Sequence, residues 1–163
     1  MCYVGRAYDP GHRTCRSCET QGARTCATRK RPRRAQAALG TITEAGVLVV
    51  YRDLRTPNAW TNKDRGNLIY RAERKAWERA CAPLPHVLGI ATGRRLLRVV
   101  RVVPDQRHLI RDETNRQGAL KPLEDALVRL GVLLDDADEF LTRELVQVID
   151  RDRPRVEIRV EDT

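Results

Sequence analysis

The 163-residue sequence has few aromatic residues, few lysines and no long apolar run. Aromatic side chains make up 4% of the chain, and only four of its 31 basic residues are lysines. A membrane-spanning helix needs about 20 consecutive apolar residues, so membrane-spanning proteins are excluded. The first ten residues lack the apolar core of a secretory signal, and five cysteines are an odd number for a disulfide framework. We therefore expect a cytoplasmic protein.

The net charge of +9 is distributed unevenly along the chain. Residues 1–40 carry nine basic and two acidic side chains, residues 41–111 carry fourteen and six, and residues 112–163 carry eight and fourteen. A basic first two-thirds favours a polyanionic partner, and an acidic last third favours the binding of cations. Arginine binds phosphate through a planar fork, although a GC-rich genome enriches arginine equally well without a functional cause. Both explanations remain open.

Residues 1–40 differ in composition from the rest of the chain. They contain glycine, proline and a basic cluster but almost no aliphatic side chains, so we expect a disordered basic leader without a core of its own. A zinc-containing regulatory arm is the alternative, because Cys15 and Cys18 have the spacing of a zinc knuckle, with His12 or Cys26 nearby. A second Cys-x-x-Cys pair is missing, so zinc at Cys15, Cys18 and Cys26 is disfavoured.

Residues 41–163 have the regular patterns of one folded domain. Apolar, β-branched runs predict strands at 47–51, 96–103, 145–149 and 156–160. Composition and apolar periodicity predict helices over 68–81 and 119–130, the second ended by Gly131. Pro122 must lie in the first turn of the second helix or kink it, so the sequence leaves the start of this helix open by several residues. The element order predicts a compact mixed α+β domain with a small mixed sheet and two main helices.

Carboxylates lie on both sides of the second predicted helix. Asp112 and Glu113 precede it, and Asp135 and Asp136 follow it. Carboxylates that meet in space favour a hard divalent cation such as Mg²⁺, with Mn²⁺ as a substitute, and such a cation suits phosphodiester hydrolysis. The same residues also suit a solvated turn or a helix cap. The charge pattern alone leaves both interpretations open.

The segment from Arg111 to Asp136 resembles the signature of the RusA family of Holliday junction resolvases. It contains R-D-E-T-N, five further residues and then K-P-L-E-D-A-L-V-R-L-G-V-L-L-D-D. The family's signature runs D-x-D-N, then K, then D-A-L, then a glycine and an aliphatic run that ends in D-D. The spacing from Lys121 to Asp136 fits this signature, and the longer interval before Lys121 is similar to that of members with a small insertion. The resemblance covers residues 47–161.

This resemblance implies a homodimeric, Mg²⁺-dependent endonuclease that cuts branched DNA, such as a four-way junction, in recombination and repair. It implies that Asp112 and Asp136 bind the metal and that Lys121 is the catalytic lysine that stabilises developing phosphate charge. Asp135 would be the accompanying acid. Thr114 stands where the motif has a second aspartate, so either Glu113 compensates, a water fills the gap, or activity is weakened or lost. The alternative is a non-catalytic junction-binding protein on the same scaffold.

The basic part of the domain is then expected to hold DNA phosphates. The residues expected to contact DNA are Asn58, Lys63, Arg65, Arg71, Arg74, Lys75 and Asn115. The arginines among them suit a solvated helix face as well. Trp77, on a predicted helix, is expected to pack in the core. Asp125 is expected to support the structure.

Overall fold

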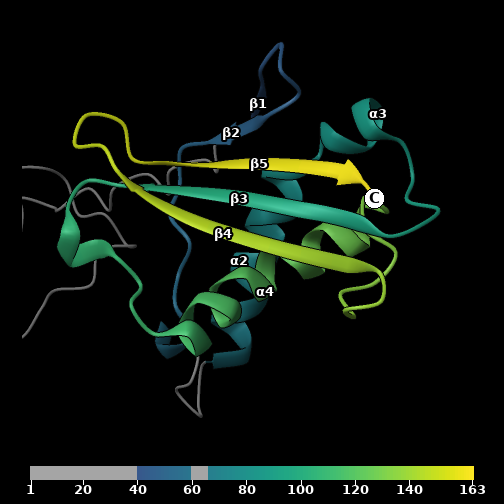
Figure 1. Ribbon diagram of the computed structural model, residues 1–163. Helices are drawn as coiled ribbons and strands as arrows, with labels where there is room; N and C mark the ends of the chain where they lie inside the picture. The colour runs from purple at the N-terminus through teal and green to yellow at the C-terminus, as the bar shows by residue number, and fades with distance from the viewer. Residues whose placement is uncertain (1–39, 60–65) are drawn as a thin grey trace, which may run out of the picture. The chain divides into compact units, whose positions relative to one another are not determined.

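The computed structural model of the chain describes residues 40–59 and 66–163. The expectations for the leader, including the zinc ligands, and for Lys63 and Arg65 lie outside these residues. The described residues form the predicted mixed α+β fold, with a five-stranded mixed sheet and helices packed on one of its faces (Figure 1). None of the helices in these two ranges is long and apolar enough to cross a membrane.

The sheet has the strand order β1-β2-β5-β3-β4. Its strands are β1 (Thr41–Ile42), β2 (Leu48–Val50), β3 (Arg95–Val103), β4 (Leu141–Ile149) and β5 (Arg155–Asp162). β3 and β4 are parallel, and the other neighbouring strands are antiparallel. The C-terminal ends of β2, β3 and β4 therefore meet the start of β5 at one end of the sheet. We call this the loop end; its connecting segments are residues 51–56, 104–112 and 150–154.

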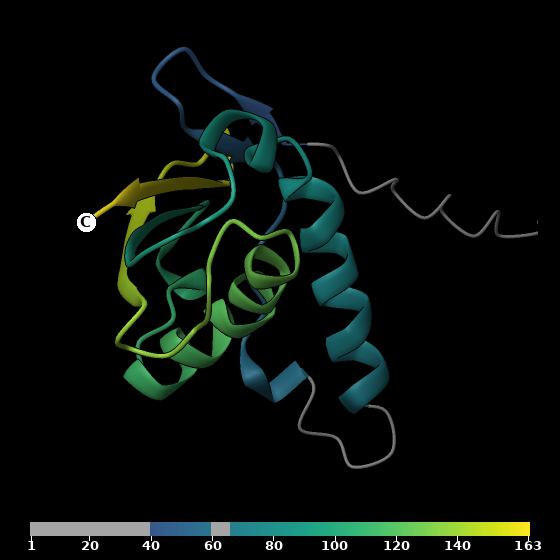
Figure 2. The same ribbon diagram turned by 90° about the vertical axis from the view of Figure 1, so that its right-hand side faces the viewer.

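Two long helices cover one face of the sheet. These are α2 (Gly66–Cys81) and α4 (Glu113–Arg129), which lie side by side (Figure 2). The described chain also contains the short helix α3 (Leu84–Leu88) and the 3-10 turns η1 (Pro57–Ala59) and η2 (Gln106–His108). Alternate side chains of β3 and β5, such as Leu97 and Ile158, are buried in one core beneath the helices. This alternation places one face of the sheet against the helices.

The structure fixes the start of the second helix, which the sequence left open. α4 begins at Glu113, six residues before Ala119, where the apolar pattern of the helix begins, and Pro122 lies in its interior. The side chain of Asp112 accepts a 2.7 Å hydrogen bond from the backbone N–H of Asn115 and so caps the helix. Pro122 removes one helical hydrogen bond and crowds the preceding turn, so the helix depends on the packing of its buried residues, such as Leu123 and Leu127, in addition to this cap. Gly131 ends the helix as predicted, with a positive φ of 72°.

Trp77 packs in the core, as its position on a predicted helix indicated. Its side chain is 1% exposed and is the largest that is fully buried in the described residues. The guanidinium of Arg52 lies 4.5 Å from the centroid of the indole ring and also pairs with the buried carboxylate of Glu73. Arg52 therefore closes the edge of the core through a cation–π contact and is engaged within the protein.

We predict that Cys81 is chemically protected in the native protein. It is fully buried at the end of α2, and burial raises the pKa of its thiol to about 12. Only the thiolate reacts with iodoacetamide, so alkylation at pH 8 should be at least about a hundredfold slower in the folded chain than in denaturant. Mass spectrometry of the peptide that contains Cys81 measures this ratio. Equal rates in the two states would contradict the burial of this thiol.

Candidate active site at Lys121

Lys121 and Asp136 contact each other although fifteen positions separate them in the sequence. The ammonium of Lys121, in the middle of α4, forms an ion pair with a carboxylate oxygen of Asp136, in the segment that follows the helix. The same ammonium lies 3.2 Å from Oδ1 of Asp125, one turn further along α4. The structure therefore joins one lysine and two carboxylates at one place.

The segment after α4 reaches Lys121 because it folds back along the helix (Figure 2). Gly131 starts this return, and the backbone N–H groups of Val132 and Leu133 both bond to the carbonyl of Leu127, at 2.9 and 3.3 Å. Val132 and Leu133 are buried, which holds the segment against the core. The aliphatic run before the paired aspartates thus has a structural purpose, because it anchors the segment that carries Asp136.

Arg143, on β4, fixes the position of Asp136. Its guanidinium donates to the backbone carbonyl of Asp136, pairs with Asp138 at 2.6 Å and pairs with Glu124 of α4 at 2.8 Å. Glu124 is buried, and this burial raises the pKa of its carboxyl, although the hydrogen bond from Arg143 opposes the shift. One arginine thus links the sheet, the helix and the return segment.

Tyr70 of α2 completes the group around Lys121. Its hydroxyl donates a 2.6 Å hydrogen bond to Oδ2 of Asp125. Burial, together with this carboxylate, raises the pKa of Tyr70 well above its usual range, so the phenol keeps its proton at neutral pH. Asp125 is thereby held between a tyrosine and a lysine. The two carboxylates and one ammonium leave a net negative charge, and Lys121 is 47% exposed, so this group is open to solvent and ligands.

Asp112 lies away from the Lys121 group. It is exposed at the loop end, where it caps α4. Nine helix positions separate it from Lys121, which corresponds to about 13 Å along the axis and about half a turn around it. Glu113 is also exposed and pairs with Arg116 at 3.2 Å. The structure therefore does not bring Asp112 and Glu113 together with Asp136.

The side of α4 that carries Lys121 has few carboxylates in its first turns. Positions four and seven residues before a helical residue share its side, and before Lys121 these are Gln117 and Thr114. Thr114 therefore lies on the side of α4 that carries Lys121. It has a hydroxyl at the position where the RusA signature has a carboxylate. Asp135 is exposed and accepts a 3.0 Å hydrogen bond from the backbone N–H of Ala137, so it shapes the turn beside Asp136.

The residues expected to bind DNA fall into several places. Arg71 and Lys75 are exposed on one side of α2 and form no ion pair with described residues, whereas Arg74 lies 3.2 Å from Glu78. Asn58 is exposed in η1, whose Pro57 packs so closely on Gly118 of α4 that a Cβ there would come within 2.2 Å of the proline ring. Asn115 lines a depression at the loop end.

The described residues around Lys121 offer Mg²⁺ few protein ligands. Among residues 40–59 and 66–163, no three His, Cys, Asp or Glu side chains lie close enough to hold a metal ion. Asp125 and Asp136 provide two carboxylates at one place, and Mg²⁺ is often bound by one or two carboxylates with water and substrate phosphate as its other ligands. The fit is therefore to a two-carboxylate site that a bound phosphate completes.

Sequence reasoning missed three contributors to this site. Asp125 could have been found from its spacing, because residues four apart share one side of a helix. The contacts of Tyr70 and Arg143 depend on tertiary packing, and neither residue carries a local signal.

A scan of protein-family models and a search of curated proteins found no match to this chain.

Proposed function

We propose that the protein is a Mg²⁺-dependent endonuclease that cuts branched DNA, as its resemblance to the RusA resolvases implies. The observation that carries this proposal is the contact of Lys121 with Asp136 and Asp125. All three belong to the segment that resembles the family signature. Lys121 and Asp125 share one side of α4, and Asp136 joins them because the return segment folds back. A solvated helix face would not require that arrangement.

The side chains of this group suit the chemistry of phosphodiester cleavage. The ammonium of Lys121 can stabilise the negative charge that develops on the phosphate in the transition state. Tyr70 and Arg143 hold Asp125 and the backbone of Asp136 in place, so the carboxylates are organised before the substrate binds. Mg²⁺ bound by these carboxylates would activate water and offset charge on the leaving oxygen.

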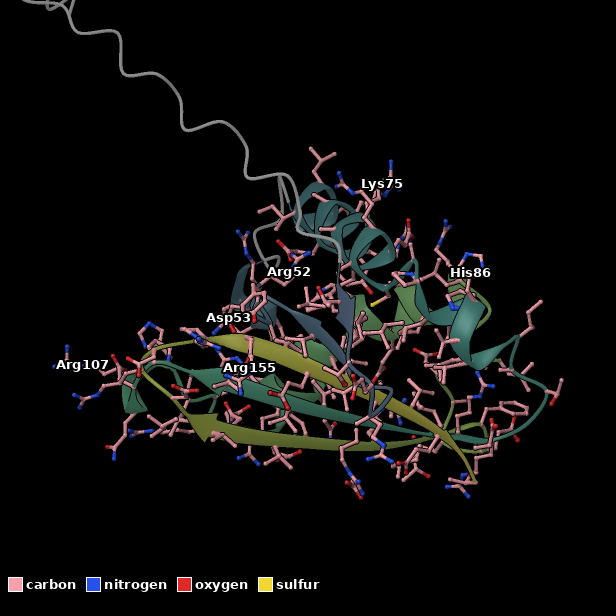
Figure 3. The ribbon with its side chains drawn as sticks, turned by 90° about the horizontal axis from the view of Figure 1, so that it is seen from above. Arg52, Asp53, Lys75, His86, Arg107 and Arg155 are labelled. Carbon is pink, nitrogen blue, oxygen red and sulfur yellow. The ribbon has the colours of Figure 1, made fainter. Side chains whose placement is uncertain are left out.

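The exposed cations of α2 support DNA as the substrate. Arg71 and Lys75 lie four positions apart on the helix that also carries Tyr70, and Figure 3 shows Lys75 extending outward from the helical layer. Side chains in this arrangement can follow a phosphate backbone without reading its sequence. Binding should accordingly weaken steeply as salt increases.

Cleavage of a synthetic four-way junction tests this function. With Mg²⁺ and low salt, the purified protein should cut the junction faster than a linear duplex made from one junction strand and its full complement. If both substrates remain intact at enzyme excess, the nuclease proposal is wrong. Equal cleavage of both would contradict only the selectivity for branched DNA.

A junction-binding protein without nuclease activity is the second candidate. Thr114 in place of a carboxylate and the remote position of Asp112 favour it, because both reduce the number of metal ligands near Lys121. This candidate predicts tight binding to the junction with or without Mg²⁺ and no cleavage products. The junction assay therefore separates the two functions, since it can record binding and cutting on the same substrate.

We further propose that the protein acts as a homodimer, and β4 offers a surface for it. β4 is an edge strand of the sheet, and the side chains of Val146 and Val148 are 46% and 44% exposed on the face opposite the helices. Exposed edge strands with aliphatic side chains favour association with another chain. A two-fold dimer would supply two equivalent sites for the two cuts across a junction.

The variant Val146→Glu/Val148→Glu should shift the protein from dimer to monomer. A dimer of this variant would bury two new carboxylates from each subunit in the interface, at a large desolvation cost. Light scattering coupled to size-exclusion chromatography measures the mass, and Glu144→Gln on the same strand is the matched control. A monomeric wild-type protein at tens of micromolar would contradict the dimer.

A further inference from the structure

We infer that the loop end of the sheet is a second DNA-binding surface, built around four arginines. Arg107 and Arg111 belong to the segment after β3, and Arg151 and Arg153 belong to the β4–β5 turn. All four are exposed, and with the described residues their guanidinium groups form no hydrogen bond or ion pair. None of the residues expected from the sequence to bind DNA is among them. The inference rests on the proposed function and names a further contact surface for the same substrate.

The segment that carries Arg107 and Arg111 is held rigidly from within. The buried guanidinium of Arg101 donates to the carbonyl of His108 at 2.5 Å, and its Nε pairs with Asp53 at 2.7 Å. Gln147 of β4 bonds both the N–H and the carbonyl of Ile110, each at 2.9 Å. The two exposed arginines therefore adjoin residues whose backbone is fixed, which lowers the entropy lost when they bind a ligand.

The β4–β5 turn is held in a similar way. Arg155 donates to the carboxylate of Asp150 at 3.1 Å and to the carbonyl of Arg153 at 2.9 Å. The N–H of Asp152 also bonds the carboxylate of Asp150, at 3.1 Å. One engaged arginine thus shapes the turn, and the side chains of Arg151 and Arg153 remain available. In both segments the partnered arginine is structural and the unpartnered ones face solvent.

The two segments face a common hollow. A depression of about 740 Å³ is lined by Pro104, Asp105, Gln106, Arg107, Ile149 and Arg151, so it contains one arginine from each segment. Arg107 and Arg111 line a neighbouring depression of about 450 Å³ together with Asn115. Figure 3 shows Arg107 extending from the loop end, with Asp53 and Arg155 toward the same end of the molecule. Arg107 thus joins Arg111 and Arg151 through two adjoining depressions, and Arg153 lines a third depression beside the same turn.

Acidic residues at the loop end limit what this surface can bind. Asp105, Asp112 and Asp150 each accept a hydrogen bond from a nearby backbone N–H, so they serve the local turns. Asp152 is exposed and forms no ion pair with the described residues. The four separate guanidinium groups can each bind a phosphate of a DNA backbone through the planar fork of arginine, and the charge of Asp152 opposes that binding.

The distance to Lys121 fits the same substrate. Asp112 marks the loop end of α4, about 13 Å along the helix axis from Lys121. Successive nucleotides of one DNA strand rise about 3.4 Å, so the two places are about four nucleotides apart. A strand positioned at Lys121 must also pass about half a turn around α4 to reach the arginine surface.

Binding of a labelled four-way junction in EDTA tests this inference, because cleavage is then suppressed. The double variants Arg107→Gln/Arg111→Gln and Arg151→Gln/Arg153→Gln should each bind about tenfold more weakly at 0.1 M salt. Each should also lower the slope of log affinity against log salt by about 2, one unit for each phosphate that the variant no longer binds. Asp152→Asn should strengthen binding severalfold.

The control is Arg94→Gln/Arg129→Gln, which removes two exposed arginines away from the loop end. Its affinity for the junction should stay within about twofold of that of the wild type, because it removes the same charge but no phosphate contact.

If the wild type binds the junction and both double variants bind it with the same affinity and the same salt slope, this inference alone is overturned. If those variants instead lost binding to phosphatidylserine vesicles, the surface would be a membrane contact. If the wild type binds the junction equally well with and without Mg²⁺ but never cuts it, the nuclease proposal is wrong. Weaker binding by the two double variants would then still support the arginine surface. Absence of any junction binding would overturn both.

Discussion

Replacing Lys121 with alanine should abolish junction cleavage while leaving the protein folded and able to bind DNA. Among the described residues, Lys121 provides the cation that pairs with the carboxylates of both Asp125 and Asp136, so its loss removes the charge that would stabilise the transition state. Loss of one such stabilising group typically costs about 10²–10³ in rate. Single-turnover cleavage at saturating enzyme measures the effect on the chemical step separately from binding.

The stability of the Lys121→Ala protein should change little. Lys121 is 47% exposed, and ion pairs at such positions contribute about 0–1 kcal/mol. Arg129→Ala is the matched control, because Arg129 is an exposed cation on the same helix with only a 3.8 Å approach to Glu78. It should retain the wild-type rate. Cleavage by Lys121→Ala at the rate of Arg129→Ala would show that Lys121 has no catalytic part.

Replacing Trp77 with alanine should destabilise the domain by about 3–5 kcal/mol. The side chain is 1% exposed, and the substitution would leave a cavity between α2 and the sheet and remove the ring beneath Arg52. Small domains have total stabilities of about 5–15 kcal/mol, so a large share would be lost. Urea unfolding followed by circular dichroism gives the free energy of unfolding.

The control for this prediction is Trp77→Phe, which keeps an aromatic ring in the same place and should cost much less than alanine. A destabilisation below about 1 kcal/mol for Trp77→Ala would contradict a core position. It would instead favour a ring that stacks on the bases of DNA.

The longer elements could be predicted because their patterns are repeated along the chain. The apolar alternation of β3 and β5 and the composition of α2 each extend over eight or more residues. The start of α4 could not, because Pro122 is compatible with a helix that starts near it and with a kinked helix that starts earlier, and the cap at Asp112 is a single hydrogen bond. β1 and α3, of two and five residues, are too short to show a period.

The candidate site was only partly predictable for a different reason. Lys121 and Asp136 were expected together through a family resemblance, and the physical cause of their contact, the anchoring of the return segment by Arg143, involves residues far apart in sequence. The unpartnered arginines of the loop end could not be distinguished from paired ones such as Arg101, since pairing depends on the fold. A count of basic residues along the chain does not separate paired arginines from unpaired ones.

The Mg²⁺ dependence of junction cleavage, measured for the wild type beside Asp136→Asn, tests the central claim most directly. Asparagine keeps the shape of the side chain but removes the charge that pairs with Lys121 and would attract the metal. The wild type should cut the junction only when Mg²⁺ is added, and Asp136→Asn should lose nearly all of that activity while still binding the junction. Equal cleavage by the two proteins, or wild-type cleavage that persists in EDTA, would contradict a metal-dependent centre at Lys121 and Asp136.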